Sequence, residues 1–317
     1  MNAKRVNWLF ASIILLNVLV VIVAAAMSEP LEIGMMFSLL LSQALIFVPA
    51  LLFLVGTRTK PGNLIAMGRP KWSTSLLVIL ITLLCMPLIA TVNAFSMLFV
   101  ENEVTNMQPL LQGVPVWQLL LMIGIIGPLN EEFVFRGVIY HGYRKSGRMV
   151  VAMLMSAVLF GLMHLNFNQM SYAVLVGIIG VLLIEGTGSI FYSMLFHVCI
   201  NVTNVIQLLL QDAETAAMDA RQTGQMVETV MHMPYKQALC VLIAVYAVIS
   251  CFTTAAAGCL FYKILKNEGR VEHFRLMFSR EGRMKVRDAE HGLLSLPLVF
   301  SALVCLLYMI ADIVWMK

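Results

Sequence analysis

A series of long apolar runs dominates this chain of 317 residues. Most of the runs are about 20 residues long, the length at which an α-helix crosses roughly 30 Å of hydrocarbon. The runs are continuous, whereas strands of a membrane β-barrel would alternate apolar and polar residues. Hydrophobic residues make up 60% of the chain and charged residues 12%, and the mean hydropathy is +0.89. We therefore predict an all-α fold, a polytopic integral membrane helical bundle.

The boundaries of the runs predict nine crossings as the best count. The expected crossings are Trp8–Met27, Ile33–Val55, Thr74–Val100, Val116–Tyr140, Met149–Met163, Tyr172–Ile184, Ile190–Leu210, Ala238–Leu265 and Leu293–Val314. The fifth and sixth runs are short, and the region from Arg148 to Gly188 could instead form one long broken hairpin, which would leave eight crossings. Since the sequence contains no repeat and no linker, residues 1–317 are predicted to form a single membrane domain.

The charges between the runs predict the orientation, because cytoplasmic loops collect Lys and Arg. Basic residues precede the first crossing and fill the second, fourth and eighth connections: Lys4, Arg5, Arg58, Lys60, Arg69, Lys71, Arg144, Lys145, Arg148 and the seven basic residues from Lys266 to Arg287. The alternate connections are acidic or neutral. We expect a cytoplasmic N-terminus in a cell membrane, and the compact nine-helix layout suggests a bacterial one. The net charge of +4 follows from this topology and indicates no nucleic-acid partner.

A few polar side chains lie inside the central apolar runs. Glu131 and Glu132 are in the fourth run, His164 ends the fifth, and His197 and Asn201 are in the seventh. A charged side chain at bilayer depth costs several kcal/mol, so ionisable residues there indicate a functional site by default. The sequence therefore predicts chemistry inside the membrane.

The two adjacent carboxylates are expected to differ in role. Glu132 and Arg136 are four residues apart, so they share a helix face and can form an ion pair. Glu131 points about 100° away and is left to act in the bundle interior as a base or a ligand. Gly127 and Pro128 suggest a kink or break just upstream. The alternative is that both carboxylates are merely helix-end charges paired with Arg136.

The two histidines carry weaker signals when each is taken alone. His164 shares a helix face with Phe160, and a lone histidine of this kind is more often a hydrogen-bonded core residue than a catalyst. His197 shares a face with Asn201, which could simply hold helices together. Counted from the cytoplasmic ends of their runs, His197 lies at about 12 Å and His164 at about 21 Å. Their convergence therefore requires tilted or broken helices.

Together these side chains suit amide hydrolysis. A carboxylate and a neutral imidazole can share a water and remove its proton, while a second imidazole and an Asn amide can stabilise an oxyanion. Glu131, His164 and His197 also form a His₂Glu set of the kind that binds catalytic Zn²⁺. The usual zinc helix His-Glu-x-x-His is absent, as are a Gly-x-Ser-x-Gly elbow, a P-loop and a dinucleotide fingerprint.

Three motifs resemble those of one known family. The run from Glu131 to Arg136 is similar to the Glu-Glu-x-x-x-Arg motif of the CPBP family, the CAAX proteases and bacteriocin-processing enzymes, also called the Abi family. The segment from Phe160 to His164 resembles its Phe-x-x-x-His motif, and that from His197 to Asn201 its His-x-x-x-Asn motif. The resemblance extends over residues 116–205, and residues 1–115 and 206–317 are then flanking transmembrane helices.

The resemblance implies an intramembrane endopeptidase of about eight helices whose site opens toward the cytoplasm. By position, Glu131 and His164 would activate the water, and His197 and Asn201 would form the oxyanion site. The family is labelled a metalloprotease, and a metal-free glutamate mechanism is also argued for its eukaryotic relatives, so Zn²⁺ at Glu131, His164 and His197 stays open. The supporting residues would be Glu132, Arg136 and Phe160.

The implied partners are a membrane protein or peptide substrate and the lipid bilayer, and the oligomeric state stays open. The competing interpretation is non-catalytic, either a membrane scaffold or a bacteriocin-immunity protein. Intact motif residues favour catalysis, because a scaffold need not keep Glu131 and His164 together. A transporter is disfavoured because no inverted repeat with paired broken helices is present.

Overall fold

The computed structural model describes residues 3–26, 34–59, 68–102, 111, 113–145, 148–210, 228–229, 232–279 and 293–315. Its helices are α1 (Ala3–Ala26), α2 (Met35–Gly56), α3 (Trp72–Ser96), α5 (Val116–Leu119), η2 (Leu120–Ile126), α6 (Gly127–Glu132), η3 (Phe133–Tyr140), α7 (His141–Arg144), α8 (Met149–Met163), α9 (Phe167–Thr187), α10 (Ile190–Leu210), α13 (Tyr235–Asn267), α14 (Val271–Phe278) and α16 (Leu296–Trp315). The elements from α5 to α7 follow without a break and form one helix, called the central helix below.

The predicted polytopic helical bundle is confirmed. Within the described ranges, eight helices are long and apolar enough to cross a membrane, and α8, with 15 residues, is a shorter apolar helix. The expected number of eight to nine crossings thus holds, with α8 as the element that decides between the two counts.

One crossing is longer than its apolar run suggested. The run Tyr172–Ile184 lies inside α9, which begins at Phe167 and ends at Thr187. Asn166 caps the helix start by accepting the backbone N–H of Gln169 at 3.0 Å, and Gly188 ends the helix in the left-handed region with φ of 75°. The predicted crossing was too short because it was based on hydropathy, which excludes the polar residues near both ends of α9.

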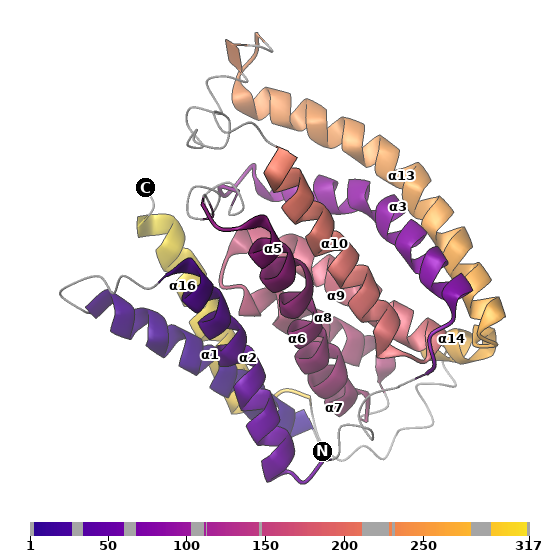
Figure 1. The fold of residues 1–317 in the computed structure, drawn as a ribbon, viewed down its shortest axis with the longest axis horizontal. Helices are drawn as coiled ribbons and strands as arrows, with labels where there is room; N and C mark the ends of the chain where they lie inside the picture. Colours follow the sequence, from indigo (N-terminus) through magenta and orange to yellow (C-terminus); the bar gives the residue numbers. More distant parts are fainter. Residues whose placement is uncertain are drawn as a thin grey trace.

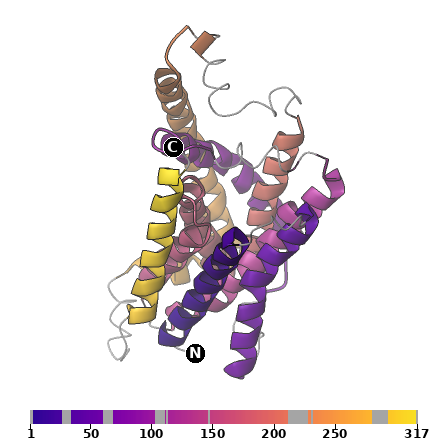
Figure 2. The same cartoon turned by 90° about the vertical axis from the view of Figure 1, so that its left-hand side faces the viewer.

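The helices are arranged around the central helix, α9 and α10 (Figure 1). At one edge of the bundle α13 lies along α3, and at another α1 pairs with α16. The N-terminus, α7 and α14 lie at one end of the molecule, whereas α5 and the end of α16 lie at the other (Figures 1 and 2). We call the first of these the basic end, because it carries Lys4, Arg5, Lys71, Arg144 and Arg270.

The turn between α9 and α10 is buried rather than placed at the surface. Ser189 is buried, and its hydroxyl donates to the carbonyl of Gly68 at 3.0 Å. The Arg270 Nε donates to the carbonyl of Glu185 at 2.8 Å, and the Lys71 backbone N–H donates to the Tyr192 hydroxyl at 2.8 Å. Segments before α3 and after α13 therefore cover this turn, and α10 begins beneath these segments rather than at the surface.

Candidate active site

The central helix carries both adjacent carboxylates in a short α-helical stretch between two π-helical stretches. The backbone N–H of Gly127 bonds to the carbonyl of Met122, five residues earlier, which is the wide π pattern. Pro128 has no N–H, so the next carbonyl in this pattern, that of Ile123, lacks its backbone donor. The Asn201 amide donates to that carbonyl at 3.1 Å. The expected kink thus takes the form of widened turns in a continuous helix, tied to α10 through Asn201.

The Glu132 carboxylate contacts three neighbouring side chains. Its carboxylate lies 3.1 Å from the Arg136 guanidinium, and both side chains are 1% exposed. Ser193 donates its hydroxyl to one carboxylate oxygen at 2.5 Å, and His197 Nδ1 lies 3.0 Å from the other. The expected ion pair is present, and the contacts to α10 are additional. The sequence analysis did not predict Ser193 as a site residue. It lies four residues before His197, so the helix period places both side chains on one face of α10.

Arg136 is enclosed by small residues and an aromatic ring. The guanidinium lies 4.1 Å from the centre of the Phe160 ring, a cation–π contact. On its other side are two glycines of α9: an added Cβ would lie 3.3 Å from the guanidinium at Gly180 and 3.5 Å at Gly177. Among the described residues, no acceptor is aligned for a hydrogen bond with Arg136, so its contact with Glu132 is an ion pair. The glycines make room for a charged side chain in the core.

His164 is oriented by the helix that it ends. Its Nδ1 lies 2.9 Å from the Phe160 carbonyl, and because a carbonyl only accepts, Nδ1 carries the proton and Nε2 is left with the lone pair. The Phe160 ring packs edge-on against both imidazoles, with centroids 5.0 Å from His164 and 5.6 Å from His197. Leu165 then adopts φ of 53°, in the left-handed region, as the chain turns into α9.

His197 is oriented in the same way. Its Nδ1 faces the Glu132 carboxylate, which only accepts, so Nδ1 donates and Nε2 points to the opposite side. There Nε2 lies 3.7 Å from a carboxylate oxygen of Glu131, too far for a direct hydrogen bond and a spacing that a water can bridge. Glu131 is 14% exposed, and within the described ranges its carboxylate makes this one contact with an imidazole at 3.7 Å.

A cavity of about 390 Å³ collects the four predicted catalytic side chains. Glu131, His164, His197 and Asn201 all line it, together with Phe160, whereas Glu132 and Arg136 lie outside its wall. His164 and His197 thus line one cavity, although their depths counted along the sequence differ. The geometry thus separates the two carboxylates, with Glu131 facing the cavity and Glu132 behind it.

The cavity extends away from the basic end. On the central helix, which ends at the basic end, its lining residues lie between Met122 and Glu131, and on α10, which begins there, they lie between His197 and Leu208. The opening toward the cytoplasm that the family resemblance implied stays a prediction.

The residues of the candidate zinc site provide suitable atoms, with one unoccupied imidazole nitrogen on each histidine and a carboxylate. Within the described part of the chain, however, no group of three His, Cys, Asp or Glu side chains is gathered closely enough to hold a metal ion. Glu131, His164 and His197 are therefore not arranged as a coordination shell in this structure, and the steps proposed below use only side chains of the protein.

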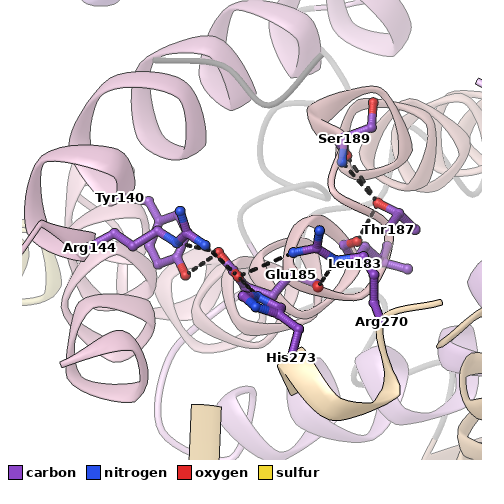
Figure 3. A network of polar contacts seen from close by, with 8 residues as sticks. All are labelled: Tyr140, Arg144, Leu183, Glu185, Thr187, Ser189, Arg270 and His273. Atoms are coloured by element: carbon purple, nitrogen blue, oxygen red, sulfur yellow. Dashed lines mark hydrogen bonds and ion pairs between the residues drawn. The ribbon is translucent and has the colours of Figure 1, made fainter. Parts of the chain in front are cut away.

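A second polar cluster, which the sequence interpretation missed, lies at the basic end (Figure 3). Glu185, 2% exposed, accepts the Tyr140 hydroxyl at 2.9 Å and pairs with Arg144 at 2.7 Å and with His273 at 2.6 Å. Tyr140 and Arg144 belong to the central helix, and His273 belongs to α14. The cluster therefore ties the end of the central helix to α9 and to α14. A carboxylate at the end of an apolar run was the only local signal for it.

The fold and this cavity define a class: polytopic helical membrane proteins with a carboxylate and imidazoles in a site within the bilayer span. Residues 113–203 match the family model described as type II CAAX prenyl endopeptidase Rce1-like. This match supports the CPBP family for the central region of the chain.

A relative supports the same class. Over 111 residues the chain is 26% identical to the Bacillus subtilis (strain 168) protein named "Putative membrane peptidase YdiL", a match covering 35% of this chain and 46% of the relative. The chain thus spans less than half the length of that curated relative. No solved structure matches the chain.

Proposed function

We propose that this protein is an intramembrane endopeptidase that hydrolyses a peptide bond of a membrane-associated protein or peptide. The observation that carries the proposal is the division of labour between the carboxylates: Glu132 is saturated by Arg136, Ser193 and His197, while Glu131 faces the cavity. A base must be free to bind water, so Glu131 is the carboxylate suited to the chemistry.

In the proposed reaction, a water between the Glu131 carboxylate and Nε2 of His164 loses a proton to Glu131 as its oxygen attacks the scissile carbonyl. The C–O bond forms and the carbonyl oxygen becomes an oxyanion. When the oxyanion collapses, the C–N bond breaks and the leaving amine takes the proton from Glu131. His164 holds the water through a lone pair whose direction is set by the bond from its Nδ1–H to Phe160.

The proposed oxyanion donors are Asn201 and His197. Asn201 uses one amide N–H on the Ile123 carbonyl and keeps the second for the substrate. His197 donates from Nδ1 to Glu132, so it can donate from Nε2 only when both ring nitrogens are protonated. The proposal therefore assigns the imidazolium form to His197 in the working enzyme, with Glu132 as its counter-ion. Donors aimed at a developing oxyanion typically contribute about 3 kcal/mol each.

Zn²⁺ held by Glu131, His164 and His197 stays a prediction. In that case the metal would supply the activated water. The contacts of the two Nδ1 atoms with the Phe160 carbonyl and the Glu132 carboxylate would orient the imidazoles. Activity measured after chelation and after Zn²⁺ readdition distinguishes this mechanism from the metal-free one.

The decisive experiment compares membrane peptides from cells that express the wild type, Glu131→Ala or His164→Ala, by mass spectrometry of newly formed peptide termini. We expect fragments that only the wild type produces, while all three proteins insert in equal amounts. Glu272→Ala, at an exposed carboxylate on α14, is the control and should behave as the wild type. Identical fragments from all four proteins would contradict proteolysis and favour the scaffold or immunity role.

A further inference from the structure

Beyond its catalytic side chains, the cavity is lined by neutral amides. Gln43 on α2, Gln169 on α9 and Asn204 on α10 reach its wall from three separate helices. We call these three residues the amide collar. Asn204 follows His197 by seven residues on α10, which places it about 10 Å farther from the basic end. A substrate that approaches Glu131 along the cavity from that direction passes Asn204.

Amides between membrane helices often serve only to hold those helices together, so this simpler role needs to be examined first. Asn17 and Asn201, which also line the cavity, do act on the protein itself, since each donates to a backbone carbonyl. Gln43 accepts from Asn130 at 3.3 Å. Gln169 and Asn204, by contrast, have side-chain amides that bond to no other group among the described residues. Two members of the collar are therefore open to a ligand.

The charge of the lining limits what that ligand can be. Glu131 is the one Asp, Glu, Lys or Arg among the described residues that line the cavity, and it belongs to the catalytic set. The rest of the wall is mainly aliphatic and aromatic, with residues such as Ile46, Met122, Val176 and Leu208. Away from Glu131 and the two histidines, a charged side chain of a bound peptide would find no oppositely charged partner in this wall. The cavity fits uncharged, apolar side chains.

A peptide drawn into this cavity also carries backbone N–H and C=O groups away from water. Each such group needs a partner in an apolar environment. A carboxamide offers a donor and an acceptor on one rigid plane, so it can bond to both kinds of backbone group without adding charge. The collar therefore supplies what an extended apolar peptide lacks at this depth.

We propose that the amide collar binds the backbone of an uncharged, apolar stretch of the substrate next to the scissile bond. The inference rests on the proposed function and adds a substrate class to it. It assigns Gln169 and Asn204 as substrate-binding residues that act on the backbone, while the apolar wall receives the side chains.

The test uses the purified full chain in lipid nanodiscs and, as the probe, peptides from a tryptic digest of a bacterial membrane fraction. Termini produced by the wild type and absent with Glu131→Ala define the cut sites. We expect no Asp, Glu, Lys or Arg within two residues of those sites. Charged residues at the frequency of the digest as a whole would overturn the proposed substrate class while leaving proteolysis established.

The fastest-cut peptide is then synthesised with an ordinary backbone and with N-methyl groups on the amides flanking the scissile bond. For Asn204→Leu and Gln169→Leu, we expect the KM of the ordinary peptide to rise about tenfold with kcat little changed, because one uniform binding contact is lost. The penalty for N-methylation should shrink in the same variants. Gln207→Leu, on the exposed side of α10, is the matched control and should keep wild-type constants.

The two failures are distinguishable. If the wild type produces no termini beyond those of Glu131→Ala, the proposed function fails and the inference falls with it. If peptides are cut but both collar variants match Gln207→Leu in KM, proteolysis stands and the collar has no role in binding.

Discussion

Replacing Glu132 by Gln tests whether this carboxylate stabilises the fold as the counter-ion of Arg136. The substitution keeps the shape of the side chain and removes its charge, which leaves the Arg136 guanidinium buried without a counter-ion. Both side chains are 1% exposed, so water cannot take over. Breaking a buried pair by removing one partner typically costs 3–5 kcal/mol, and we expect a loss of about that size. Cellular yield should fall together with activity.

An exposed ion pair of the same chemistry provides the control. Glu272 lies 3.7 Å from Arg275 on α14, with side chains 69% and 79% exposed. Exposed pairs contribute roughly 0–1 kcal/mol, so Glu272→Gln should be close to neutral. The assay is reversible unfolding of each purified protein in detergent, followed as a function of denaturant.

The double variant Glu132→Gln with Arg136→Met separates stability from chemistry. Removing both charges eliminates the unpaired guanidinium, and Met can fill the place over the Phe160 ring, so most of the lost stability should return. Activity should stay low, because the protonated His197 of the proposed mechanism has lost its counter-ion. The reasoning is refuted if Glu132→Gln is as stable as Glu272→Gln, or if the double variant is less stable than the single one.

Two further predictions concern packing and the basic end. Gly180→Ala would place a Cβ 2.6 Å from the Ser193 hydroxyl and should destabilise the protein by about 1–3 kcal/mol in the same unfolding assay. Gly258→Ala is the control: no atom lies within 4 Å of the added Cβ, so this variant should be neutral or slightly stabilising. His273→Leu removes the α14 contact to Glu185, so backbone amides of α14 should exchange hydrogen faster by mass spectrometry while those of α9 keep their wild-type rates. Unchanged exchange in α14 would mean that the contact does not hold the helix.

Local spacing was sufficient to predict the parts of the site that lie on one helix. Glu132 and Arg136 are four residues apart, and so are Phe160 and His164, and both pairs meet in the structure because a helix returns to the same face after four residues. The segment types follow from hydropathy for the same reason: each crossing is a local property of its own 20 residues. These features require no knowledge of which helices are neighbours.

Contacts between helices were beyond local spacing. His197 and Glu132 are 65 residues apart, and Glu185 and His273 are 88 residues apart, so no periodicity relates them. The buried α9–α10 turn was missed because apolar runs were assumed to start at the membrane surface. The depths counted from the ends of the runs therefore differed, although both histidines line one cavity in the structure.

The bilayer explains why a site of this kind is surrounded by so many structural polar contacts. In hydrocarbon an unpaired charge is excluded, so each catalytic group must be oriented by a partner that is itself satisfied. Glu132 fixes His197, and Arg136 balances Glu132 while it supports Phe160, whose backbone carbonyl fixes His164. Glu131 meets this chain of contacts at one point among the described residues, 3.7 Å from Nε2 of His197. The two adjacent carboxylates have different surroundings because about 100° separates them on the helix: Glu132 is enclosed by its partners, whereas Glu131 faces the cavity.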